Sequence, residues 1–142
     1  MVILLEEFRQ FSLLLNHLSV PFEFVHGGAS EEAKEFIPKE YWDSDTEAAI
    51  ARFNSGQTKV LIGTSAISTG VDLRPVGCLI YMQGGTSEIK IKQAIGRGTR
   101  ITEGLKDFWV VDFIIKGSPV LERHAGVRAD MYQDIGTVEF FG

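Results

Sequence analysis

One short stretch combines an amide side chain with two guanidinium groups at a regular spacing. From residue 93 to residue 100 it reads Gln-Ala-Ile-Gly-Arg-Gly-Thr-Arg. In a helix, Gln93, Arg97 and Arg100 would project from one face, because they follow the i, i+4, i+7 spacing. The planar fork of a guanidinium group matches the oxygens of a phosphate group. The pattern therefore indicates phosphate recognition, with solvated arginines at a helix end as the alternative.

A second polar stretch follows an apolar run upstream. Thr64 and Ser65 come directly after Val-Leu-Ile-Gly, and Gly70-Val71-Asp72 follows a few residues later. Hydroxyl residues at the junction of a strand and a helical turn are common N-caps, and Gly-x-Asp is common in turns. Taken alone, these residues are compatible with ordinary local structure.

Together the two stretches resemble a known family. Gln93-x-x-Gly96-Arg97-x-x-Arg100 resembles motif VI of superfamily 2 helicases and translocases, and residues 60–73 resemble their motif V. The motifs occur in the family's order and about twenty residues apart, as in the family's second RecA-like domain. By this resemblance, residues 1–142 are identified as the C-terminal RecA-like motor domain, most similar to phage-type DNA repair and recombination helicases.

The resemblance implies roles around a nucleotide. Arg100 would act as an arginine finger on the transferring phosphoryl group, and Arg97 would be the second candidate for this role. Gln93 would help to place the hydrolytic water or the γ-phosphate. Gly70 and Asp72 would lie near the nucleotide, with the carboxylate accepting from a ribose hydroxyl. The cofactor would be ATP with Mg²⁺, bound mainly by a first RecA-like domain.

The resemblance also implies contacts with a nucleic-acid strand, for which we expect DNA rather than RNA. Thr64 and Ser65 would contact phosphates, helped by backbone N–H groups at a helix start. His26-Gly27 would lie along the strand backbone, because glycine allows close approach. For His26 the alternative is a hydrogen-bonded histidine at the end of a strand.

The apolar pattern predicts an α/β fold. Largely apolar runs predict strands at residues 2–5, 22–25, 59–63, 79–82 and 108–115, the last interrupted by Asp112, with a short final strand at 137–141. Helical patterns alternate with them at 8–18, from Ser30, from Asp43 or Ser44 to 54, from Ser87, and at 119–132. This alternation favours a three-layer αβα, RecA-like domain with a mostly parallel sheet, whose sites lie at the carboxyl ends of strands.

Composition restricts the classes of protein. A net charge of −5 argues against wrapping nucleic acid by overall field. The single cysteine excludes an internal disulfide, and His17, His26 and His124 are too far apart in sequence for a common zinc pattern, so we expect no metal site. The apolar start is too short for a membrane span. We expect a cytoplasmic protein, in the host cytoplasm if phage-encoded.

Three alternatives remain. The sequence has no Gly-x-x-x-x-Gly-Lys-[Ser/Thr] loop, so we expect no ATP hydrolysis by this chain alone, and a free-standing binding module without turnover is the first alternative. A dinucleotide-binding enzyme is disfavoured because Ile101 occupies the third glycine position. A receiver-like domain, suggested by Glu6-Glu7, would leave the Gln93 motif unexplained.

On the last helix, we expect Arg123, His124 and Arg128 to form a solvated face.

Overall fold

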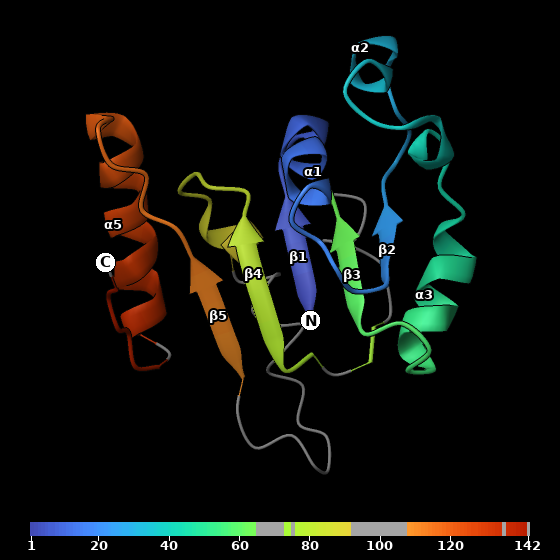
Figure 1. Cartoon of the computed structure of the whole chain (residues 1–142). Helices are drawn as coiled ribbons and strands as arrows, with labels where there is room; N and C mark the ends of the chain where they lie inside the picture. The colour runs from blue at the N-terminus through green and yellow to red at the C-terminus, as the bar shows by residue number, and fades with distance from the viewer. Residues whose placement is uncertain (65–72, 75, 92–107, 135, 142) are drawn as a thin grey trace.

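The chain folds around one parallel sheet. The computed structural model describes residues 1–64, 73–74, 76–91, 108–134 and 136–141. Within these residues the sheet has five strands in the order β2-β3-β1-β4-β5, and every neighbouring pair is parallel. Figure 1 shows the strands side by side with their arrows in one direction. The predicted α/β class with a parallel sheet is confirmed.

Fully apolar sequences form the middle of the sheet. β1 (Val2–Leu5) lies between β3 (Val60–Gly63) and β4 (Cys78–Met82), and every residue of β1 and β3 is buried. Strands covered on both faces need apolar side chains on both sides, so their sequences do not alternate. β2 (Phe22–Val25) and β5 (Trp109–Asp112) are the outer strands.

Two apolar layers cover the sheet. On one face, the buried Phe11 of α1 (Phe8–Leu15) packs with Ile3, Leu5 and Ile62, next to η1 (Lys39–Tyr41). On the other face, Phe53 of α3 (Thr46–Asn54) lies in a separate cluster of buried residues, and the partly buried Tyr132 of α5 (Pro119–Gln133) packs against this cluster. Figure 1 shows α3 beside β2 and α5 beside β5, at opposite edges. These layers make the αβα architecture.

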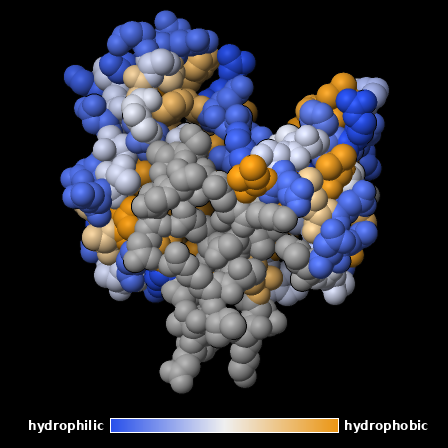
Figure 2. Space-filling model, turned by 180° about the vertical axis from the view of Figure 1, so that it is seen from behind, coloured by the Kyte–Doolittle hydropathy of each residue, from blue (hydrophilic) through white to orange (hydrophobic). Residues whose placement is uncertain are grey.

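Side-chain caps begin three of the helices. Ser30 Oγ accepts from Ala33 N–H at the start of α2 (Glu31–Lys34), as the sequence predicts. Asp45 caps α3 by accepting from Ala48 N–H, so this helix starts slightly later than expected. Ser118 caps α5, which has proline at its start and matches the predicted helix closely. In Figure 2 the projecting region around α2 carries mostly hydrophilic side chains.

Two predicted strands differ from the structure. The run predicted at 108–115 forms a strand only over Trp109–Asp112, because Phe113 N–H donates to the Asp112 carboxylate (2.6 Å) where the ladder would continue. The strand predicted at 137–141 is absent, and Phe140 and Phe141 are exposed. A strand without a neighbour has nothing to satisfy its backbone groups, so apolar residues alone do not form one.

Candidate functional site at the carboxyl edge of the sheet

The ends of β2 and β3 bring two of the predicted site residues together. Val25 pairs with Gly63 in the parallel register, so the next residues, His26 and Thr64, lie side by side at the carboxyl edge. Thr64 N–H donates to the Val25 carbonyl (3.2 Å), which continues the ladder to the edge. Gly27 follows His26 and is exposed. The structure therefore brings His26, Gly27 and Thr64 together, as the fold predicts.

The imidazole of His26 has both ring nitrogens engaged within the protein. Its Nδ1 accepts from Gly28 N–H (3.0 Å), and its Nε2 lies 2.8 Å from the Tyr41 carbonyl oxygen. A carbonyl only accepts, so Nε2 carries the proton and the ring is neutral. The ring is only 3% exposed and packs edge-on against Phe8 at 5.0 Å between centroids. His26 thus shapes the loop, and the backbone of Gly27 and Gly28 is what remains open to a ligand.

The glycine pair gives this loop an open backbone. Gly28 has φ +129°, a conformation that residues with a side chain rarely adopt. A Cβ atom added at Gly27 or Gly28 would meet no heavy atom within 4 Å. Packing within the chain therefore does not require glycine at residue 27. A close approach by another molecule remains a physical reason for a small residue there.

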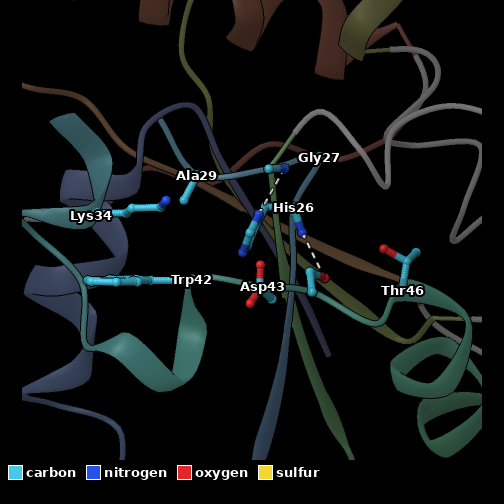
Figure 3. Close-up of a pocket in the computed structure, with 9 residues that line it drawn as sticks. His26, Gly27, Ala29, Lys34, Trp42, Asp43 and Thr46 are labelled. Carbon is cyan, nitrogen blue, oxygen red and sulfur yellow. Dashed lines mark hydrogen bonds between the residues drawn. The ribbon is translucent and has the colours of Figure 1, made fainter. Parts of the chain in front are cut away.

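A shallow cavity of 510 Å³ adjoins the glycine loop (Figure 3). Its lining is mixed, with backbone from the loop, one ammonium group, one indole, one exposed carboxylate and two hydroxyls, contributed by Gly27, Gly28, Lys34, Trp42, Asp43, Ser44 and Thr46. Lys34 Nζ lies 5.3 Å from the centre of the Trp42 ring and 3.1 Å from Glu31. Ser44 Oγ accepts from His26 N–H (3.4 Å) and so joins this wall to the loop.

The segment between residues 31 and 47 is rich in acids, and the structure shows how it packs on the domain. Its apolar and aromatic residues, Ile37, Tyr41 and Trp42, pack in the α1 layer, while its acids face solvent. Trp42 Nε1 donates to the Ile37 carbonyl (3.1 Å), which closes the segment on itself. Sequence reasoning missed Lys34, Trp42 and Ser44 as neighbours of the loop. The sequence signal that could have found them is the aromatic pair Tyr41-Trp42 within a strongly acidic segment.

A second pair of glycines follows β4. Gly84 and Gly85 both have positive φ, +69° and +74°, and the Tyr81 hydroxyl donates to the Gly84 carbonyl (3.4 Å). Arg128 of α5 contacts the same turn, and only 4% of this arginine is exposed. The expectation of a solvated Arg128 was wrong, because its guanidinium pairs with Asp112 at the end of β5. Arg123 is exposed, as expected.

The remaining predicted site residues lie outside the described part of the chain. These are Ser65, Gly70, Asp72, Gln93, Arg97 and Arg100. The described chain reaches residue 91 in helical conformation, in line with the helix predicted from Ser87, and Ile91 is buried in the core. Among the described residues, no group of three or more His, Cys, Asp or Glu could hold a metal ion. In the same part of the chain, no helix has the length and apolar character needed to cross a membrane.

Comparison with known proteins relates the chain to helicases. Residues 1–102 match the model of the helicase conserved C-terminal domain. The chain is 29% identical over 115 residues to IRC3 of Saccharomyces cerevisiae, whose name assigns it to the ATP-dependent helicases. It is 39% identical over 72 residues to D10 of Escherichia phage T5, also named as a helicase. These alignments cover 72% and 51% of this chain but only 16% of each relative.

Solved structures share the fold at low sequence identity. The C-terminal domain of the DEAD-box protein Dbp5 superposes with a TM-score of 0.64 at 18% identity, covering 97% of this chain and 71% of that one. The C-terminal part of the Fun30 ATPase domain superposes with a TM-score of 0.62 at 18% identity, covering 89% of this chain and 38% of that one. At such identities the likeness concerns the fold alone.

Proposed function

Because this chain belongs to the helicase conserved C-terminal domain family, we propose that it is the C-terminal motor domain of an ATP-dependent superfamily 2 DNA helicase or translocase. The domain extends over residues 1–142 in this proposal. Its main support is the family match over residues 1–102, a range that includes both the Gly70-Val71-Asp72 stretch and the Gln93-to-Arg100 stretch. ATP hydrolysis requires a second, Walker-A-bearing RecA-like domain, in cis or in trans.

Arg100, Arg97 and Gln93 would carry the catalytic contribution of this domain. ATP with Mg²⁺ would be held mainly by the first RecA-like domain, and its bound metal would supply charge stabilisation on the phosphate oxygens. Arg100 would neutralise charge that develops on the transferring phosphoryl group, with Arg97 beside it. Gln93 would help to place the attacking water or the γ-phosphate. Gly70 and Asp72 would contact the nucleotide, the carboxylate accepting a hydrogen bond from its sugar.

The carboxyl edge of β2 and β3 would hold the nucleic-acid strand. The Gly27-Gly28 backbone is open, and Thr64 lies next to it at the same edge. Backbone N–H groups and hydroxyls bind phosphate without reading sequence, as a translocating enzyme requires. Thr64 and Ser65 would contact phosphates, while His26 holds the loop in shape. DNA is favoured over RNA because the two motifs resemble those of phage-type DNA repair and recombination helicases.

ATP hydrolysis by matched variants tests the proposal. In an assembly of this domain with its Walker-A-bearing partner domain, Arg100→Ala should lower kcat by about 10²- to 10⁵-fold, with a much smaller change in ATP affinity. Arg100→Lys should stay impaired, because one ammonium group cannot reproduce the guanidinium fork. The control is Arg123→Ala, which removes an exposed arginine from α5. Near-normal kcat in Arg100→Ala would remove the arginine-finger assignment.

Addition of the partner domain distinguishes a motor domain from a free-standing binding module. The sequence has no Walker A loop, so the isolated domain should show no DNA-stimulated ATP hydrolysis under either hypothesis. Addition of the partner domain should restore turnover only if this chain is a motor half. If turnover stays absent while the chain alone binds DNA tightly at high salt, the binding module is the better explanation.

A further inference from the structure

A buried arginine on α5 joins three segments that are distant in sequence. Arg128 donates from Nε to Asp112 Oδ2 (2.7 Å) and from Nη2 to Asp112 Oδ1 (3.2 Å), which makes a bidentate pair. The same guanidinium donates to the Phe113 carbonyl (3.2 Å) and, from Nη1, to the Gly85 carbonyl (2.9 Å). One side chain thus connects α5, the end of β5 and the turn after β4.

Tyr132 completes the polar cluster from the next turn of α5. Its hydroxyl donates to Asp112 Oδ2 at 2.7 Å, so the carboxylate receives three hydrogen bonds from α5. Burial, together with this hydrogen bond, raises the pKa of Tyr132 well above its ordinary value. The phenol therefore remains a donor throughout the neutral range. Asp112 is held in place by two side chains and in turn orients the guanidinium.

The contact with Gly85 is the informative one, because it reaches the turn from a distant part of the chain. Gly84 and Gly85 both adopt positive φ, and an added Cβ at either would meet no heavy atom within 4 Å. The space beside both glycines is therefore open. Among the described residues, the two carbonyls of the turn accept hydrogen bonds, Gly84 from the Tyr81 hydroxyl and Gly85 from Arg128. The Arg128 contact spans 43 residues of sequence.

The turn leads directly into the segment with the proposed catalytic residues. Ser87 Oγ accepts from Lys90 N–H (3.3 Å) and the Ser87 carbonyl accepts from Ile91 N–H (3.1 Å), so helical structure starts two residues after Gly85. Gln93 comes two residues after Ile91. The conformation of the Gly84-Gly85 turn therefore determines the position and direction in which the helix after Ser87 begins.

Net stability alone is a weak explanation for such a cluster. Replacement of a buried ion pair by well-packed apolar groups is often neutral or stabilising, because desolvation offsets the Coulomb attraction. A planar fork that reaches a carboxylate and two carbonyls at once instead defines one geometry. We propose that Arg128, oriented by Asp112 and Tyr132, is a positioning residue that fixes the Gly84-Gly85 turn and thereby the helical start at Ser87, from which the chain leads to Gln93. This inference rests on the proposed function for the role of that segment.

Hydrogen exchange measured on this chain tests whether Arg128 fixes the turn, and it needs no activity measurement. In Arg128→Lys the ammonium group can still pair with Asp112 but cannot also reach Gly85, so the amides of residues 86–91 should exchange at least about tenfold faster. Amides of β1 and β3 should keep their wild-type rates. Arg123→Lys makes the same chemical change at an exposed position of α5 and should alter neither region. Tyr132→Phe retains the Arg128 contacts and should change residues 86–91 by less than about threefold.

Kinetics of the two-domain assembly test the functional half. Displacement of catalytic groups by about 1 Å can cost roughly 10²-fold, so Arg128→Lys should lower kcat by about 10- to 100-fold at nearly unchanged KM for ATP. Arg123→Lys should retain wild-type kcat. If exchange at residues 86–91 is unchanged, or rises equally throughout the protein, the positioning role is wrong.

The outcomes separate this inference from the proposed function. Faster local exchange with unchanged kcat in Arg128→Lys would reject positioning of catalytic residues. If Arg100→Ala also leaves kcat unchanged, the arginine-finger proposal fails as well. Loss of kcat in Arg100→Ala but not in Arg128→Lys would support the proposed function and reject the further inference alone.

Discussion

The Nε2 atom of His26 lies 2.8 Å from the Tyr41 carbonyl oxygen and ties the end of β2 to the segment that follows α2. The other ring nitrogen accepts from Gly28 N–H (Figure 3), so one neutral imidazole connects the glycine loop with η1, and the next residue, Trp42, lines the adjoining cavity. A side chain with both nitrogens engaged is suited to hold a loop, and leaves phosphate contacts to the neighbouring backbone.

His26→Ala should therefore act on stability. The substitution removes a buried ring and leaves the Tyr41 carbonyl and the Gly28 N–H without their partner, so the free energy of unfolding should fall by about 2–4 kcal/mol. Urea denaturation measures this loss. The control, His17→Ala, changes an exposed histidine and should stay within about 0.5 kcal/mol of wild type. Wild-type stability together with lost DNA binding in His26→Ala would instead indicate that the ring itself contacts the strand.

Two alanine substitutions separate close approach from backbone strain. Gly27→Ala places a methyl group in open space at ordinary φ, so stability should change by less than about 0.5 kcal/mol. If a strand backbone approaches this residue, Kd for single-stranded DNA should rise by about 3- to 10-fold, equivalent to one weakened hydrogen bond. Fluorescence anisotropy at fixed salt measures Kd.

Gly28→Ala is the matched comparison. Its φ of +129° makes a side chain unfavourable, so stability should fall by about 1–3 kcal/mol whether or not DNA binds there. If Gly27→Ala binds single-stranded DNA with the same Kd as wild type, the strand does not pass over this loop.

Alkaline pH should reduce the contribution of the buried Tyr132 hydroxyl to the free energy of unfolding. The pKa of Tyr132 is raised in the folded protein, by burial first and then by the hydrogen bond to Asp112, from an ordinary value of 10.0. The nearby Asp112 and Tyr81 add to this rise, and Arg128 opposes it. Above about pH 10 the unfolded chain releases the phenolic proton while the folded chain keeps it, so the free energy of unfolding falls as pH increases.

Tyr132→Phe isolates this contribution, because Tyr41 and Tyr81 also have raised pKa values owing to burial. The unfolding free energy of wild type minus that of Tyr132→Phe should be constant below about pH 9. Above about pH 10 this difference should shrink by up to about 1.4 kcal/mol per pH unit. Urea titrations between about pH 8 and pH 11 provide the measurement. A difference independent of pH would show that Tyr132 titrates at its ordinary value.

Local sequence determined much of the fold. β1 and β2 have the predicted bounds, and in β1 this follows because a strand buried on both faces needs several adjacent apolar residues. Ser30 was identified as an N-cap because its hydroxyl serves an amide three residues ahead. The family was identified from two short stretches of sequence, and the match over residues 1–102 confirms it. These signals all act over a few residues.

Only the tertiary structure decided which distant groups meet. The order β2-β3-β1-β4-β5 follows from how the strands pack, and no residue of β1 specifies its two neighbours. Arg128 resembles any polar residue of a helix until α5 packs against β5 and brings Asp112, 16 residues away, within 2.7 Å. His26 looked equally suited to bind a ligand or a carbonyl until Tyr41 occupied its Nε2. The partner of a polar group depends on the chain's path through space, whereas periodicity depends only on immediate neighbours.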